Sequence, residues 1–326
     1  MAADGGTKAV VAALLANTGI AITKFVAFLV AGNSSMLAES IHSVADAGNQ
    51  GLLLLGGKKS RREATPEHPF GFGRERYIYS FIVAIVLFSV GGLFALYEAY
   101  HKWHEIRGGH AEHADGWQQY LPLVVLLVAI VLESLSFRTA ITETAKIKGS
   151  ATYAQFIRRA KQPELPVILL EDLAALLGLL FALVGVGMSI VTGNLYWDVA
   201  GTALIGVLLV CVAVVLAIET KSLLLGEAAS PEAQRRITAA VDQTEGVEHV
   251  IHMKTMHLGP EELLVAAKIA VPPGSTADAV AAAIDAAERA VRAAEPTAQV
   301  IYLEPDIYRH HHVPDARPEP PAPAGH

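Results

Sequence analysis

The chain has 326 residues, of which 52% are hydrophobic and 17% are charged, and its formal net charge is −7. Soluble domains usually carry about 25% charged residues, so this composition argues against an ordinary soluble globular protein. Cys211 is the only cysteine, which excludes an internal disulfide.

The apolar residues gather in runs long enough to cross a bilayer, for which a helix needs about 20 residues. Nearly continuous apolar runs cover residues 9–31, 78–97, 121–135, 173–192 and 199–218. The first run is too long, and too weakly basic at its start, to be a signal peptide. With residues 36–56 as a further span, the sequence predicts an α-helical membrane protein with six transmembrane helices in residues 1–225.

Basic residues are unevenly distributed between the two sets of loops. The loops after the second and fourth spans carry six Lys and Arg residues each, whereas the loops of the other side carry only Lys102 and Arg107. Because positively charged loops stay in the cytoplasm, both termini are predicted to be cytoplasmic. The expected location is the inner membrane of a bacterial cell, so the lipid bilayer is an expected partner and a nucleic acid is not.

The predicted second span begins with a polar stripe. Its side chains lie about one turn apart along one face of a helix; they are Glu39, His42, Asp46, Asn49 and Gln50. Ionisable groups in a span cost roughly 2.5–3.5 kcal/mol each on insertion scales and usually mark an ion path. A hydrogen-bonded His–Asp pair in the core is the alternative, but the density of polar groups favours the ion path. His42 and Asp46, four residues apart, could together hold a divalent cation.

The fifth span adds the adjacent acids Glu171 and Asp172 within an apolar run. Adjacent helical residues point about 100° apart, so one of these acids should face the cavity of the second span squarely and the other only partly. Glu133 in the fourth span is a third buried acid, for which a structural or proton-handling role and metal ligation both stay open. Zinc-like ions take about four ligands, so both spans are needed.

Beyond Lys221 the pattern changes to a small α+β domain at residues 230–308. Ser230 precedes a helix with Pro in its first position, two strands flank a Gly-Pro turn, and a second helix leads to a last strand at 298–303. A core this small gains from pairing with a second copy, so a homodimer is expected. The tail, residues 309–326, is rich in Pro and Ala and is predicted to be disordered. Its histidines at 310–312 are expected to be solvated.

These features together resemble the cation diffusion facilitator family. The resemblance rests on the motifs NSSMLAESIHSVAD, HPFGFGRER and YWDVAGTALIG, on the acid of the fifth span and on the terminal α-β-β-α-β order. It implies six helices with a cytoplasmic ferredoxin-like domain and zinc transport by proton antiport. The HxxxD pattern of the second span is most similar to the branch containing the animal mitochondrial zinc transporter.

The resemblance also implies which residues bind the metal. The family's ligand pair on the second span falls on His42 and Asp46, and the later member of its pair on the fifth span falls on Asp172. The earlier member falls on Ile168, which has no donor atom, so Glu171 is expected to complete the site, with Glu133 or water as the alternative. The accessory sites are expected to be degraded, because only His68 remains in the loop at 66–74 and the last strand ends in Tyr302-Leu303-Glu304.

The predicted function is therefore efflux of a divalent cation by alternating access to a site between the second and fifth helices. Zn²⁺ is the expected substrate, and Fe²⁺, Co²⁺ or Mn²⁺ also suit a mixture of imidazole and carboxylate donors. Metal ligands must be deprotonated to bind, so proton arrival releases metal. No enzymatic step is required, and an intramembrane metalloprotease would need a His-Glu-x-x-His set that the chain lacks. A metal sensor, or a structural protein whose polar stripe only joins helices, stays open.

Overall fold

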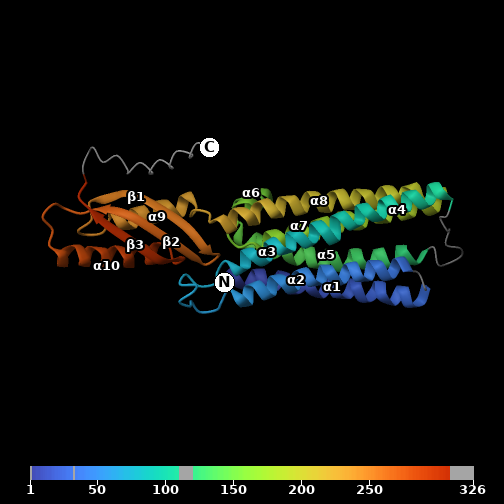
Figure 1. Ribbon diagram of the computed structural model, residues 1–326, viewed down its shortest axis with the longest axis horizontal. Coiled ribbons are helices and arrows are strands. Elements are labelled where there is room, and N and C mark those ends of the chain that lie inside the picture. Colours follow the sequence, from blue (N-terminus) through green and yellow to red (C-terminus); the bar gives the residue numbers. More distant parts are fainter. Residues whose placement is uncertain (1, 32–33, 110–119, 309–326) are drawn as a thin grey trace, which may run out of the picture. The chain divides into compact units, whose positions relative to one another are not determined.

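The computed structural model of the protein describes residues 2–31, 34–109 and 120–308 (Figure 1). Within these ranges, the side chains of residues 2–5, 30–31, 34–39, 41 and 42 are outside the description. The tail predicted to be disordered and the histidines at 310–312 lie outside the described residues as well. The chain divides into two compact units, Met1–Gly226 and Glu227–His326.

The first unit consists of helices. They are α1 (Ala2–Ala31), α2 (Ser34–Lys59), α3 (Glu75–Val86), η1 (Leu87–Leu93), α4 (Phe94–Gly108), α5 (Leu121–Ile147), α6 (Tyr153–Arg159), α7 (Glu164–Thr192) and α8 (Tyr196–Leu225). The segments α3, η1 and α4 follow one another directly, and η1 is a seven-residue π-helical stretch between two α-helical ones. Lys102 and Arg107, which were predicted to lie in loops, lie in α4 instead.

Five segments of the described chain are long and apolar enough to cross a membrane. They are Gly6–Leu29, Glu75–Gly108, Leu121–Ile147, Glu164–Thr192 and Tyr196–Leu225. The protein is thus a multi-pass helical membrane protein. The sixth predicted span, α2, has 26 residues, but the polar stripe in its first half lowers its hydropathy, so it does not meet the same criterion.

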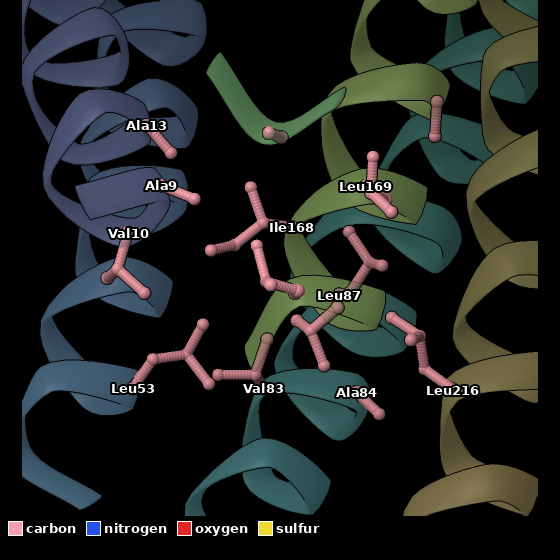
Figure 2. Close-up of a cluster of buried hydrophobic side chains, with 14 of the residues drawn as sticks. Ala9, Val10, Ala13, Leu53, Val83, Ala84, Leu87, Ile168, Leu169 and Leu216 are labelled. Carbon is pink, nitrogen blue, oxygen red and sulfur yellow. The ribbon is translucent and has the colours of Figure 1, made fainter. Parts of the chain in front are cut away.

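The long segments form a closed ring, and α2 is part of it. Packing contacts join α1 to α2, α2 to α3, α3 and α4 to α8, α8 to α7, α7 to α5, and α5 back to α1. At the end of the ring where α1 begins, apolar side chains from α1, α2, α3, η1, α5, α7 and α8 pack together (Figure 2). This apolar cluster includes Ala9, Val10, Ala13, Leu53, Val83, Ala84, Leu87, Ile168, Leu169 and Leu216.

Glycines bring α7 and α8 close together. A Cβ atom at Gly201 would lie 2.8 Å from the carbonyl oxygen of Phe181, and a Cβ atom at Gly185 would lie 2.9 Å from that of Trp197. These distances are shorter than any normal contact, so only glycine fits at either position. Small residues let backbones approach in this way where neighbouring lipid offers no hydrophobic driving force.

The second unit has two helices and a three-stranded mixed sheet. Its elements are α9 (Pro231–Asp242), β1 (His249–Gly259), β2 (Glu262–Ala270), α10 (Ala277–Ala294) and β3 (Ala298–Asp306), in the predicted α-β-β-α-β order. β2 lies between β1, with which it pairs antiparallel, and β3, with which it pairs parallel. The Ser230 hydroxyl caps α9 and the Thr276 hydroxyl caps α10. The core between helices and sheet is built around Ile237, Val265, Ile269 and Val291.

Candidate functional site

A cavity of about 220 Å³ lies inside the helical unit. This is far above the roughly 10–15 Å³ that one water molecule requires, so an ion fits together with part of its water shell. Its walls are mostly apolar. The polar residues that line it are Asn17, Lys24, Ser43, Asp46, Glu98, Lys102, Glu133, Glu171, Asp198 and Thr202.

The cavity runs along the bundle toward one end. Lining residues on α7 extend from Glu171 to Val186, and at 1.5 Å per helical residue this is roughly 20 Å. At one end lie the acids Asp46, Glu133 and Glu171, which we call the deep end. At the other end the lining reaches the last part of α4 and the start of α8, which we call the mouth.

The apolar cluster adjoins the deep end. Leu87 belongs both to the cavity lining and to that cluster. Ile168, the position at which the family resemblance expects a ligand, is completely buried in the cluster. Figure 2 shows it among the side chains of Val10, Leu53 and Val83. Position 168 therefore packs among apolar side chains, and its isoleucine offers the cavity no atom that could bind a metal.

Glu171 joins α7 to the polar stripe of α2. Its Oε1 accepts a hydrogen bond of 2.9 Å from Nδ2 of Asn49, and its Oε2 accepts one of 3.0 Å from Nε2 of Gln50. Gln50 in turn accepts a 3.2 Å hydrogen bond from Nδ2 of Asn17 on α1. All four side chains are buried. The two amides of the stripe thus orient the Glu171 carboxylate, and each of its oxygens keeps a second lone pair.

Asp172 points toward α5. Its Oδ2 accepts a 2.7 Å hydrogen bond from the hydroxyl of Ser136, while its Oδ1 is buried and has no hydrogen-bond partner among the described residues. Asp172 does not line the cavity, whereas Glu171 does. The two adjacent acids therefore face different surroundings, as the 100° between them requires.

Glu133 is the third acid of the deep end. Its side chain is almost fully buried, lines the cavity and accepts no hydrogen bond in the described part of the chain. The charges of Asp46, Glu171, Asp172 and Lys24 are close enough to act on it. Glu133 thus belongs to the same electrostatic group as the acids of α2 and α7.

The second span contributes Asp46 to the cavity lining. His42 lies one turn earlier on α2, but its side chain is outside the described ones. Among the side chains that the structure does describe, no three of His, Cys, Asp and Glu come together as a ready-made metal site. The structure brings Asp46, Glu133 and Glu171 to one cavity, and the ligand set itself stays a prediction.

The mouth carries an ion-pair network that sequence reasoning missed. Nζ of Lys102 lies 3.0 Å from Oδ2 of Asp198 and 3.2 Å from Oε1 of Glu98, and 3.4 Å from the hydroxyl of Thr202. Asp198 is part of the YWDVAGTALIG motif, which was a usable signal. Lys24 was missed as well, although it interrupts the apolar run at 9–31.

His68 lies on an exposed loop between α2 and α3. Its ring packs on that of Phe72, with 4.7 Å between ring centroids. In the second unit, Glu304 on β3 pairs with Lys268, with 3.2 Å between their charged atoms. The degradation of both accessory sites stays a prediction.

Comparison with known proteins identifies the family. The sequence-family model of the cation efflux transmembrane domain matches residues 10–225. The chain therefore belongs to the cation efflux, or cation diffusion facilitator, family. This confirms the resemblance drawn from the motifs.

Several relatives carry informative names. The proton-coupled zinc antiporter SLC30A9, mitochondrial, of Mus musculus is 34% identical over 259 residues, which cover 78% of this chain and 44% of the relative. Its counterpart in Homo sapiens is 33% identical over the same share of each chain. The manganese efflux system protein MneP of Bacillus subtilis is 25% identical over 79% of this chain and 81% of the relative. The chain spans about half the length of the animal relatives.

Proposed function

We propose that the protein exports a divalent metal cation by proton-coupled antiport, with Zn²⁺ as its substrate. The observation that carries this proposal is the cavity, which has acids at its deep end and apolar packing beyond them. A membrane cavity that contains buried carboxylates usually marks an ion path. The names of the animal relatives, which specify proton-coupled zinc antiport, support the same function.

The metal-binding site is proposed to use His42, Asp46, Glu171 and Asp172, between α2 and α7. Asp46 and Glu171 line the same cavity, Asp172 follows Glu171 directly, and His42 precedes Asp46 by one helical turn. To reach the ion, Asp172 would have to turn from Ser136 and use its Oδ1, which has no hydrogen-bond partner among the described residues. Glu133 is the alternative fourth ligand, because it lines the cavity without a hydrogen-bond partner in the described chain.

Alternating access follows if the apolar cluster opens and the mouth closes. In the described conformation the lining reaches the end of α4 and the start of α8, while the cluster packs below the acids. Protons that enter from the mouth would neutralise the carboxylates and release the metal, since ligands must be deprotonated to bind.

Mn²⁺ is the second candidate substrate. The described donors around the deep end are carboxylate, amide and hydroxyl oxygens, and hard oxygen ligands suit Mn²⁺. The Bacillus subtilis relative is named as a manganese efflux protein. Fe²⁺ and Co²⁺ fit if the imidazole of His42 takes part.

The topology and the assembly are part of the proposal. The basic loops and the closed ring support six spans with α2 among them and both termini in the cytoplasm, and the proposed location is a bacterial inner membrane. Residues 1–225 would form the transmembrane domain, and residues 230–308 a cytoplasmic ferredoxin-like domain that pairs in a homodimer.

Flux into sealed vesicles tests the function. Purified full-length protein in proteoliposomes with an imposed pH gradient should move Zn²⁺ across the membrane. Protons should move in the opposite direction, which a pH-sensitive dye inside the vesicles would detect. Asp46→Ala and His42→Ala should abolish this flux and leave the protein folded in the membrane. Wild-type vesicles without any metal flux would favour the sensor or structural alternative, and wild-type rates in either variant would remove that residue from the site.

A further inference from the structure

Lys24 places a positive charge inside the transport cavity. It lies within the apolar segment Gly6–Leu29 of α1 and is 9% exposed. Asn17, seven residues earlier and thus on the same helical face, lines the cavity with it. An ammonium group in a membrane span is costly unless it faces protein charges or water. The acids Asp46, Glu133 and Glu171 line the same cavity as Lys24.

Lys24 shares the cavity lining with the acids of the deep end. It lines the cavity together with Asp46, Glu133 and Glu171, and its charge is one of several that act on Glu133. The other lysine of the cavity, Lys102, is held by Asp198 and Glu98 at the mouth. Those two mouth acids therefore already have a cation, and Lys24 is the second lysine in the lining that also contains the deep-end acids.

We propose that Lys24 is a built-in counter-ion of the transport site, which an arriving divalent cation must displace from the carboxylates. The inference rests on the proposed function, that a divalent metal ion binds at the deep end. A lysine suits this role because its ammonium is a compact charge on a flexible stem and can swing away. In the metal-free state it neutralises acids that would otherwise repel one another in a low-dielectric cavity. When the ammonium group of Lys24 returns to the carboxylates, it competes with the metal and speeds release of the metal.

This role has a clear signature, because the competing charge makes binding weaker than the ligands alone would allow. Removing it should tighten binding of the metal and slow its release. A lysine that only joined helices would have the opposite effect, since its loss would distort the site and weaken binding. The sign of the change in affinity therefore separates the two roles.

The test compares three variants of the full-length chain. Lys24→Met removes the charge and keeps most of the side-chain volume, and Lys24→Arg keeps the charge. Lys8→Met is the matched control, because Lys8 lies on the same helix, is exposed and does not line the cavity. Calorimetry in detergent measures the Kd for Zn²⁺ and for Mn²⁺, and flux into proteoliposomes gives KM and kcat.

We expect Lys24→Met to bind Zn²⁺ at least about tenfold more tightly than the wild type, which corresponds to about 1.4 kcal/mol. Its KM should fall, and its kcat should fall too if release limits turnover. Lys24→Arg and Lys8→Met should stay near the wild type in all three constants.

An unchanged or weaker Kd in Lys24→Met would overturn the inference and leave the proposed function intact. A wild-type protein that binds neither Zn²⁺ nor Mn²⁺ would overturn both. Should Lys24→Met not be recovered as a folded protein, Lys24→Gln takes its place with the same expected tightening, because glutamine also removes the charge and can still hydrogen-bond within the cavity.

Discussion

At the scale of single residues, the acids of the helical unit differ in what surrounds them. Both oxygens of Glu171 are held by amides, and Asp172 is held at one oxygen by a hydroxyl. Glu133 accepts no hydrogen bond within the described chain and faces the cavity. A carboxylate that already has hydrogen-bond donors is oriented before a metal arrives, whereas one without them is free to turn. The roles of these three acids can therefore be separated by substitution.

Asp172→Asn should abolish transport and leave the fold intact. Asparagine keeps an oxygen that accepts from Ser136, and its amide nitrogen replaces an oxygen that has no hydrogen-bond partner in the described chain. The change removes the charge that a metal needs. Flux in proteoliposomes and thermal unfolding in detergent measure the two effects, and Ser136→Ala is the control, which should retain transport. Wild-type flux in Asp172→Asn would contradict the assignment.

Glu171→Gln should weaken Zn²⁺ binding more than Asn49→Ala does. Glutamine offers one acceptor oxygen to two amide donors, so one of Asn49 and Gln50 loses its partner at a cost of about 1–3 kcal/mol. Asn49→Ala loosens the same carboxylate but keeps its charge. Calorimetry at a fixed pH compares the two Kd values. If Glu171→Gln binds as tightly as the wild type, Glu171 is structural, and Glu133 or water is the better candidate for the fourth ligand.

At the scale of helices and strands, close backbone contacts and caps hold the elements in register. The α7–α8 contact depends on Gly185 and Gly201, and it positions the wall of the cavity that carries Glu171 and Asp198. In the second unit, hydroxyl caps begin both helices, and an ion pair joins the end of α10 to α9. Each of these features predicts a measurable loss of folding stability when a methyl group is added or a charge is removed.

Gly201→Ala should destabilise the helical unit. The added Cβ would lie 2.8 Å from the backbone oxygen of Phe181, which can relieve the overlap only if the helices separate. We expect a loss of about 1–3 kcal/mol, typical of overpacking, and a lower unfolding temperature in detergent. Gly187→Ala on α7 is the matched control, because nothing lies within 4 Å of its added Cβ. Equal unfolding temperatures for Gly201→Ala and Gly187→Ala would contradict the proposed tight contact.

Glu295 should stabilise the second unit in a pH-dependent way. Burial raises the pKa of Glu295, but hydrogen bonds from Thr297 and Arg236 and the charge of Arg236 outweigh burial and hold the pKa below its ordinary value of 4.5. Since the folded pKa lies below the unfolded one, the stabilisation is complete above about pH 4.5 and is lost as the pH falls through the folded value.

Hydrogen exchange of α9 in the full-length protein measures this effect. Arg236 is half-exposed, so the ion pair should contribute about 0.2–1 kcal/mol. Glu295→Gln should speed exchange relative to the wild type at pH 7, and the difference should shrink toward pH 4. A difference that is independent of pH would mean that the carboxylate charge does not contribute.

At the scale of the whole molecule, the two compact units differ in what they contain. The helical unit contains the cavity and matches the cation efflux family, whereas the second unit contributes a small mixed sheet with two helices. On that second unit, Tyr302 and Ile307 are large exposed hydrophobic residues near the end of the chain. A small core with exposed apolar side chains gains stability by pairing with another copy.

The full-length protein should therefore be a homodimer. Light scattering of detergent-purified protein, corrected for bound detergent, should give twice the chain mass of 34.6 kDa. Tyr302→Glu should shift the population toward the single chain, since it places a charge in the expected interface, and Gln299→Glu on the same strand serves as the control. One chain per particle in the wild type would contradict the prediction.

The sequence by itself determined the class of protein and predicted a metal site on α2 and α7. Apolar runs, basic loops and the α-β-β-α-β order are local patterns that each segment carries without its neighbours, and the family resemblance that they support is confirmed. Only the tertiary structure decided which acid faces the cavity. That choice depends on the rotation and packing of helices distant in sequence: Asn49 and Gln50 hold Glu171, Ser136 holds Asp172, and Ile168 lies in apolar packing. The fold likewise decided that Lys24, a lysine in an apolar run, lines the same cavity as Asp46 and Glu133.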